Sequence, residues 1–224
     1  MKRVIIFLVF CVIVLPLFAQ ADVTRVAPGA EAQLSNLLNK PAMVKPAVAV
    51  PLGRNWFTLE TDAHVFTDEV SVRQVAEVFL DIENQAKFFD GRRSKLTASR
   101  VSQNENGLIV DYVSIAIVPV VSIRLNTPYR ASVRTDVYTD TKFLLDISQI
   151  PQDSETNGKI KNLYAPRYVE EVTINGKKYT YIRTYAKMDI DASILPGAKN
   201  TLERNSGPTN EEALQMVITA AKTK

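Results

Sequence analysis

The stretch between residues 168 and 185 carries the most chemically varied side chains of this 224-residue chain. Asn175-Gly176 is typical of a two-residue β-hairpin turn, because both residues accept positive φ angles. Such a turn would pair Ile174 with Lys177 and would fix the register of both strands. One face of the hairpin would then carry Tyr168, Glu170, Val172, Tyr179, Tyr181, Arg183 and Tyr185. On that face Glu170 and Arg183 are diagonal neighbours within reach of each other.

Two interpretations of this face are open. If it lines an apolar cavity, the tyrosines provide apolar walls with polar tips and the Glu170–Arg183 pair orients the polar head of a ligand. The predicted ligand-binding residues are then Tyr168, Glu170, Tyr181, Arg183 and Tyr185. If it lies in solvent, the opposite face with Val169, Ile182 and Met188 forms the core. The sequence favours the second interpretation, since that opposite face is more evenly apolar and a buried unpaired charge is costly. The same choice applies to Arg124, for which a solvated position is expected.

No catalytic or metal-binding set is evident in the sequence. A metal site needs converging His, Cys, Asp or Glu side chains, whereas the only histidine is His64 and the only cysteine is Cys11. Asp189 and Asp191 lie at a strand end, where carboxylates are usually solvated. The chain has neither a Gly-x-Ser-x-Gly nucleophile turn nor a glycine-rich phosphate loop. We therefore expect no enzyme activity, no metal and no cofactor.

The first residues have the layout of a secretory signal peptide. Lys2 and Arg3 precede an apolar run from Val4 to Phe18, and small residues follow at Ala19 and Ala21. The run is shorter than the roughly 20 residues of a membrane-spanning helix. The sequence predicts a signal peptide over 1–21, cleavage near Ala19 or Ala21, and a periplasmic or secreted protein without disulfides.

Charge and composition exclude one class of partner. The formal net charge of +3 includes Lys2 and Arg3, and residues 1–20 hold no Asp or Glu, so the remainder carries +1. Such a chain, without a basic run, lacks the electrostatic footprint for nucleic acid.

The rest of the chain divides into a leader and one domain. Residues 22–53 contain Pro28, Pro41, Pro46 and Pro51, which indicates an extended or poorly ordered linker with one short amphipathic helix over 31–38. The domain is expected over 54–224. A capping box of Ser71 and Gln74 predicts a helix, with apolar positions repeating at Val72, Val75, Ala76, Phe79 and Ile82.

Alternating patterns predict seven antiparallel strands. The first is in "WFTLETDAHVF", and the others cover 95–104, 108–118, 121–138, 141–149, 160–174 and 177–190. Asn-Gly pairs at 106–107, 157–158 and 175–176 mark turns. The tail is helical, and Gly207-Pro208 is expected to divide it, with Thr209 capping the second piece.

This order of elements resembles the START-related helix-grip superfamily, which includes lipid-transfer domains, pollen-allergen-like proteins and polyketide cyclase-like proteins. The stretches "SVRQVAEVFLDIENQAKFFDGRRSKLTASRV" and "DIDASILPGAKNTLERNSGPTNEEAL" carry the resemblance. It implies an α+β helix-grip fold, in which a curved seven-stranded antiparallel sheet wraps around a long C-terminal helix after an early helix pair. It also implies a ligand cavity between sheet and helix, with Leu214 and Val217 on the helix face that covers it. The divided tail and the long loop over 149–165 depart from the family pattern.

The function expected from this resemblance is binding or carriage of a hydrophobic small molecule, such as a lipid, fatty acid, sterol-like or polyketide-like compound. One alternative is a cyclase or aromatase type of enzyme that uses Tyr, Arg or Glu groups. Another is an envelope protein-interaction module whose leader contacts partners. Transient membrane or envelope-protein contact is compatible with each of them, and the sequence leaves the oligomeric state open.

Overall fold

The structure is a computed structural model that describes residues 22–81, 84–88, 94–104, 107–118, 121–133, 138–149, 159–194 and 196–224. Between 94 and 133 the backbone alone is described. The predicted signal peptide over 1–21, the side chain of Arg124, the turns at Asn106 and Asn157-Gly158, and most of the 149–165 loop lie outside the described residues.

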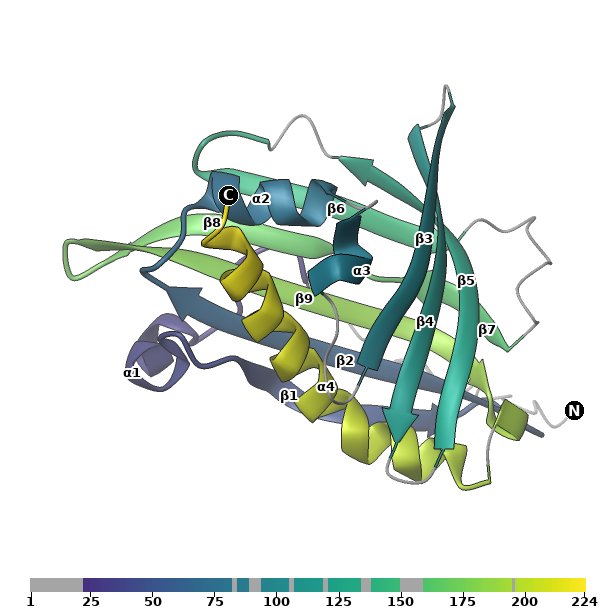
Figure 1. Cartoon of the computed structure of the whole chain (residues 1–224). Helices are drawn as coiled ribbons and strands as arrows, with labels where there is room; N and C mark the ends of the chain where they lie inside the picture. The colour runs from purple at the N-terminus through teal and green to yellow at the C-terminus, as the bar shows by residue number, and fades with distance from the viewer. Residues whose placement is uncertain are drawn as a thin grey trace, which may run out of the picture.

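The described chain forms one antiparallel sheet with helices on both faces (Figure 1). The strands are β1 (Ala42–Pro51), β2 (Trp56–Thr67), β3 (Ser94–Asn104), β4 (Gly107–Val118), β5 (Val121–Val133), β6 (Lys142–Gln149), β7 (Ile160–Tyr164), β8 (Arg167–Ile174) and β9 (Lys177–Asp191). The helical elements are η1 (Glu31–Gln33), α1 (Leu34–Leu37), α2 (Val72–Leu80), α3 (Gln85–Phe88), η3 (Ala192–Ile194) and α4 (Ala198–Ala221). The sheet order is β1-β2-β9-β7-β6-β5-β4-β3, and β8 pairs with β6 and β9.

The α+β helix-grip architecture is confirmed, with nine strands rather than seven. One extra strand arises because the predicted strand over 160–174 divides into β7 and β8. The division falls at Ala165-Pro166, where proline cannot donate to the strand ladder. The other extra strand is β1, which pairs with β2 at the edge of the sheet.

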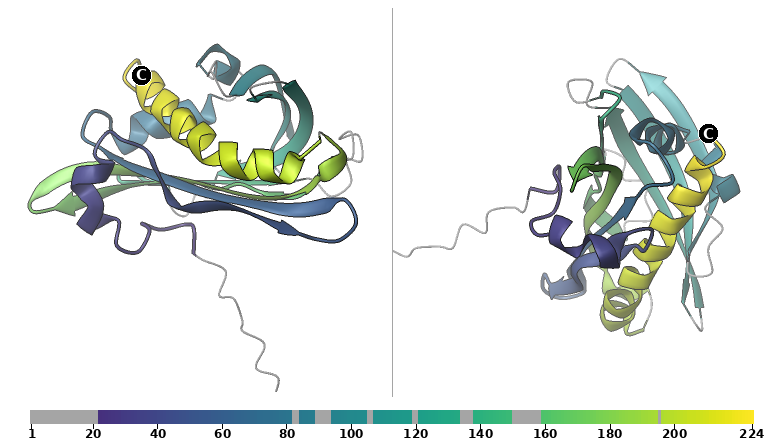
Figure 2. Two further views of the ribbon diagram at one scale, coloured as in Figure 1. Left: turned by 90° about the horizontal axis from the view of Figure 1, so that it is seen from below. Right: turned by 90° about the vertical axis from the view of Figure 1, so that its left-hand side faces the viewer.

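The expectation of a linker over 22–53 is wrong for most of that segment. Residues 42–51 form β1, and residues 22–38, which we name the strap, lie on the face of the sheet opposite to α4 (Figure 2). Val23, Ala27, Ala30 and Leu37 of the strap are each at most 6% exposed. Proline is tolerated in β1 because an edge strand has N–H groups that need no sheet partner.

The helix α4 is continuous, so the predicted division at Gly207-Pro208 is wrong. Gly207 is buried, and a Cβ added there would lie 3.3 Å from Cγ of Met43, so a glycine lets the helix pass close to β1. Thr209 does not cap a second helix, because its hydroxyl donates to the Asn205 carbonyl at 2.8 Å. A proline inside a helix removes one backbone hydrogen bond and bends the axis. Figure 2 shows α4 changing direction midway.

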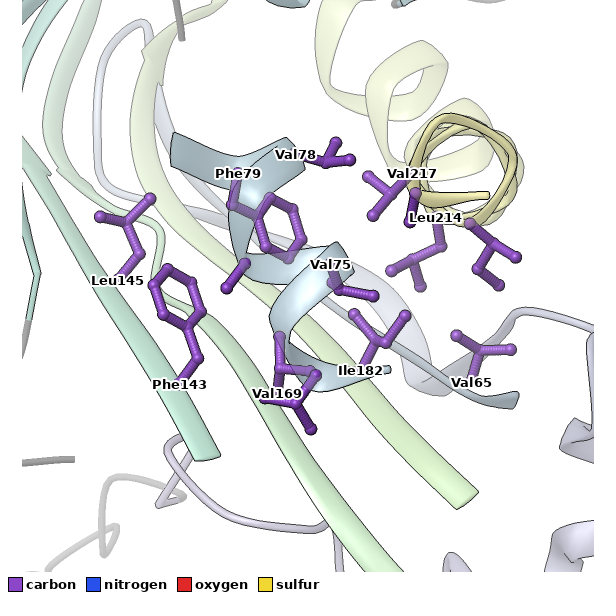
Figure 3. Close-up of a cluster of buried hydrophobic side chains, with 14 of the residues drawn as sticks. Val65, Val75, Val78, Phe79, Phe143, Leu145, Val169, Ile182, Leu214 and Val217 are labelled. Atoms are coloured by element: carbon purple, nitrogen blue, oxygen red, sulfur yellow. The ribbon is translucent and has the colours of Figure 1, made fainter. Parts of the chain in front are cut away.

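The main core lies between the sheet, α2 and the C-terminal half of α4 (Figure 3). The capping box of Ser71 and Gln74 is present at the start of α2. Val75 and Phe79 of α2 meet Phe143 of β6, Ile182 of β9 and Leu214 of α4. A second cluster joins the strap to Phe66, Leu144, Tyr168 and Tyr181. Both faces of the sheet are therefore covered.

Candidate functional site

The candidate ligand site is a cavity of about 820 Å³ beside α4 and α3. Its apolar lining is Phe88, Pro208, Met216 and Ala220. Its polar lining is Glu211, Glu212, Gln215, Thr219 and Thr223. Small-molecule pockets are usually lined mainly by apolar side chains, and this lining is more mixed, while its volume lies within the usual range of about 300–1,000 Å³.

The two sides of α4 have different roles. Leu214, Val217, Ile218 and Ala221 are buried in the main core, and Figure 3 shows Leu214 and Val217 directed toward Ile182 and Val75. The residues that line the cavity belong to the other side of the same helical turns, because successive residues are separated by 100° around an α-helix. Leu214 and Val217 were predicted to bind ligand. They lie in the main core between α4 and the sheet, while Met216 and Ala220 line the cavity.

The predicted register of the β8–β9 hairpin is confirmed in full. Ile174 pairs with Lys177, Glu170 with Tyr181, and Tyr168 with Arg183. Asn175 and Gly176 both have positive φ angles, 51° and 79°. Val169 and Ile182 belong to the core beneath α4, as the second interpretation of this hairpin expects.

The face with Tyr168, Glu170, Tyr181, Arg183 and Tyr185 is the outer face of the sheet, opposite to α4. Its expected role as a cavity wall therefore does not match its position. The expectation of a solvated face is also wrong for Tyr168, Tyr181, Arg183 and Tyr185, which are at most 4% exposed. The strap covers this region, and the two partners of this contact are more than 150 residues apart in the sequence. Alternation within a strand cannot predict such a contact.

Arg183 forms a buried ion pair with Asp62, not with Glu170. Its Nε lies 2.9 Å from Oδ1 of Asp62 and its Nη2 lies 2.7 Å from Oδ2, with both side chains 2% exposed. Nη1 donates to the backbone carbonyls of Asp22 at 3.1 Å and Arg25 at 2.9 Å. Burial opposes the charge of Arg183, but the hydrogen bonds and charge of Asp62 outweigh burial and raise the pKa of Arg183. The Asp62–Arg183 pair thus anchors the strap, because Arg183 binds the backbone carbonyls of Asp22 and Arg25.

His64 and Tyr181 form a second anchor of the strap. The Tyr181 hydroxyl accepts a hydrogen bond from the Ala27 N–H at 3.0 Å and lies 3.1 Å from Nδ1 of His64. Burial lowers the pKa of His64 to about 4, and the Arg183 charge adds to this effect. His64 is therefore neutral near pH 7, and with its ring hydrogen on Nε2 its Nδ1 atom accepts a hydrogen bond from the Tyr181 hydroxyl. Burial also raises the pKa of Tyr181, so the phenol keeps this proton.

Glu170 and Tyr185 make local contacts on the same outer face. The Tyr168 hydroxyl donates to Glu170, whose carboxylate also lies 3.6 Å from Nζ of Lys142. Burial and the hydrogen bond to Glu170 raise the pKa of Tyr168. Burial and the Glu60 carboxylate likewise raise the pKa of Tyr185. None of these contacts faces the cavity beside α4.

The sequence analysis missed Asp62 and the polar residues along α4. Asp62 occupies an even-numbered position of β2, as does His64, so both share the outer face and Asp62 is diagonal to Arg183 across the β2–β9 ladder. A polar residue at an alternate position of a buried strand was the available signal. Among the described residues, no group of three His, Cys, Asp or Glu side chains could hold a metal ion. No helix in the described part of the chain is long and apolar enough to span a membrane.

Comparison with known proteins finds likeness at the level of structure. No protein-family model matches the chain, and no curated protein matches its sequence. A STAR-related lipid transfer protein from Xanthomonas axonopodis superposes with a TM-score of 0.51 at 10% identity, covering 80% of this chain and 99% of that chain. The Zhui aromatase/cyclase from Streptomyces sp. R1128 gives a TM-score of 0.49 at 12% identity, covering 74% and 94% of the two chains. Human STARD10 superposes with a TM-score of 0.49 at 11% identity, covering 79% of this chain and 73% of that chain. At these identities the likeness concerns the fold alone, and this chain has the helix-grip fold in common with the STAR-related lipid transfer protein.

Proposed function

We propose that this protein binds or carries a hydrophobic small molecule in the cavity beside α4. The observation that carries the proposal is the cavity of about 820 Å³ lined by Phe88, Pro208, Met216 and Ala220. Its size suits a lipid, fatty acid, sterol-like or polyketide-like compound. The helix-grip fold shared with a STAR-related lipid transfer protein supports the same function. Glu211 and Gln215 on one side of the cavity offer polar groups for the head of such a ligand.

Mild extraction of the purified protein followed by mass spectrometry tests this proposal. A hydrophobic compound should be recovered from the wild-type protein in a fixed ratio to protein. The Met216→Asp variant should lose most of it, because the change places a charge in the apolar wall of the cavity. Glu31→Gln, on an exposed residue of the strap side of the sheet, is the matched control and should retain the compound. Equal recovery from the wild-type and Met216→Asp proteins would contradict the proposed site.

The residue that was expected to carry a cyclase or aromatase activity does not lie at this site. Glu170 was the best candidate for acid–base chemistry, and it lies on the outer face in contact with Tyr168 and Lys142. General acid–base catalysis needs a side chain within hydrogen-bond reach of the reacting group. We therefore keep binding as the proposed function and give catalysis no residue assignment.

We also propose that the protein is exported to the periplasm or secreted. The basic start, the apolar run from Val4 to Phe18 and the small residues at Ala19 and Ala21 support export with cleavage near Ala19 or Ala21. N-terminal sequencing of the protein from an envelope or culture fraction tests this directly. A first residue of Met1 would contradict cleavage.

A further inference from the structure

An apolar patch lies on the part of the outer face that the strap leaves open. Val48, Val50 and Leu52 are 41%, 52% and 54% exposed, and Tyr138 is the only other exposed large hydrophobic residue in the described part of the chain. Val48 pairs with Glu60 and Val50 with Thr58, so both share the outer face with the even-numbered residues of β2. We name Val48, Val50, Leu52 and the neighbouring Trp56 the hairpin patch.

Two basic residues lie at the rim of the hairpin patch. Arg54 is exposed in the turn between β1 and β2, and Nζ of Lys161 lies 4.4 Å from the centre of the Trp56 ring. Neither cation has a carboxylate partner among the contacts of the described residues. Of the carboxylates nearby, Glu60 has a cation as its partner, while Asp189, opposite Lys161 in the β7–β9 ladder, has only neutral donors and keeps its negative charge. Asp189 accepts from Thr58 and Asn162, and Glu60 pairs with Lys45.

The edge of β1 is unsuited to pairing with a strand of another chain. Pro46 and Pro51 lack N–H groups, and the Ala49 N–H already donates to the Glu203 carboxylate at 3.1 Å. Prolines in an edge strand are a common means of preventing strand addition. The patch therefore offers a contact through its side chains rather than through its backbone.

The charge at the rim of the patch selects the kind of surface that it fits. Arg54 and Lys161 have no ion-pair partner among the described residues, and the carboxylate of Asp189 offsets only one of these two charges. Exposed apolar side chains with an excess of basic charge beside them match the interfacial region of an anionic membrane. We therefore favour a lipid surface over a protein partner.

We propose that the hairpin patch docks the protein on an anionic lipid surface. Interfacial binding of this kind combines burial of apolar side chains at the headgroup level with attraction between basic residues and anionic lipids. Val50 and Leu52 supply the apolar contact, while Trp56 and Lys161 provide an aromatic ring and a cation at the rim. The inference goes beyond ligand binding, because docking does not depend on what the cavity holds.

Vesicle sedimentation tests the docking surface. The chain beginning at Asp22 contains every contact described above and is the protein to use. It should sediment with vesicles of phosphatidylcholine and phosphatidylglycerol in equal parts, and less with phosphatidylcholine alone or at high salt. The Val50→Ser/Leu52→Ser variant should lower the partition coefficient at least about tenfold, since it removes two apolar side chains from the interface. Lys161→Gln should reduce the preference for anionic vesicles.

Tyr138→Ser is the matched control, because among the side chains that the structure describes it removes the exposed large hydrophobic residue outside the hairpin patch. It should sediment as the wild type does. The proposal is overturned if the wild-type protein does not sediment, or if the double variant sediments equally well. It is also overturned if the double substitution only converts a dimer to a monomer in light scattering, which would make the patch a contact between two copies. Recovery of the hydrophobic compound should be the same in the double variant, so failure of docking is distinguishable from failure of the proposed function.

Discussion

At the scale of single residues, the outer face depends on a buried charge pair that holds two distant segments together. Arg183 is neutralised by Asp62 and also binds two carbonyls of the strap. Removing one member of such a pair leaves the other charge buried without a partner. The free-energy cost of that lone charge exceeds the net stabilisation that the intact pair provides.

We therefore predict that Asp62→Ala lowers the free energy of unfolding by about 3–5 kcal/mol. Urea denaturation followed by circular dichroism measures the change. Asp68→Ala is the control, because Asp68 pairs with Lys177 at 2.8 Å on the exposed surface. A surface pair of this kind contributes at most about 1 kcal/mol. Equal effects of the two substitutions would show that the Asp62–Arg183 pair does not anchor the strap.

His64 should make stability depend on pH. Its folded pKa of about 4 is below the ordinary value of 6.5, so the unfolded chain binds a proton that the folded chain does not. The contribution of His64 to the free energy of unfolding is complete above pH 6.5, and this contribution is lost as the pH falls from 6.5 toward 4. From these two values the loss at pH 5 is about 2 kcal/mol.

The His64→Gln variant should lack this pH dependence between pH 6.5 and 5. The carboxylates with lowered pKa values, such as Asp68 and Asp81, lose their contribution only at lower pH, near and below their ordinary value of 3.8. The window above pH 5 therefore isolates His64. Parallel stability curves for the wild-type and variant proteins would contradict a buried neutral histidine.

At the scale of elements, the strap is a structural part of the domain. Leu37 is 1% exposed and packs with Phe66, Tyr168 and Tyr181 beneath it. Loss of this side chain would leave a cavity between α1 and the sheet. We predict that Leu37→Ala lowers the free energy of unfolding by about 2–5 kcal/mol.

Chemical denaturation measures this effect, and Asn36→Ala is the control because Asn36 is the exposed neighbour in the same helix. Amide hydrogen exchange of residues 22–38 provides a second measurement. In the wild-type protein these amides should be protected. Rapid exchange there, together with an unchanged stability of Leu37→Ala, would mean that the strap is detached.

The sequence correctly predicted the elements that depend on a turn or a helix cap a few residues long. The register of β8 and β9 follows from the turn at Asn175-Gly176, and the start of α2 follows from the capping box of Ser71 and Gln74. The errors have a different origin. β1 was taken for a linker because Pro46 and Pro51 are unfavourable in most strands, although an edge strand tolerates them. The expected break at Gly207 was wrong because tertiary contact with Met43 favours a glycine there.

The candidate site shows the same limit. The register of the β8–β9 hairpin predicted which residues share its outer face. It could not predict that the strap covers this face, because the strap is more than 150 residues away in the sequence. The sequence predicted that α4 would cover a cavity. It chose the side with Leu214 and Val217, whereas Met216 and Ala220 on the other side line the cavity, because α4 has apolar residues on both sides.

At the scale of the whole molecule, the two faces of the sheet carry different features. The strap covers the part of the outer face that carries the buried charge pair, and the hairpin patch lies on the part that it leaves open. The inner face holds the main core under one side of α4, while the other side of α4 lines the cavity. Stability and ligand retention should therefore be separable by substitutions on the same helix.

Leu214→Asp and Met216→Asp test this separation. Leu214 is fully buried in the core, so a carboxylate there should lower stability strongly and should release the hydrophobic compound as the helix detaches. Met216 is half-buried at the cavity, so its substitution should reduce retention of the compound while the midpoint of urea denaturation of the ligand-free protein changes little. In the wild-type protein a ligand at a hundredfold excess over its dissociation constant should add about 2.7 kcal/mol of stability. That gain should be absent in Met216→Asp. If both variants lose stability equally without ligand, Met216 belongs to the core, and the cavity beside α4 is not the binding site.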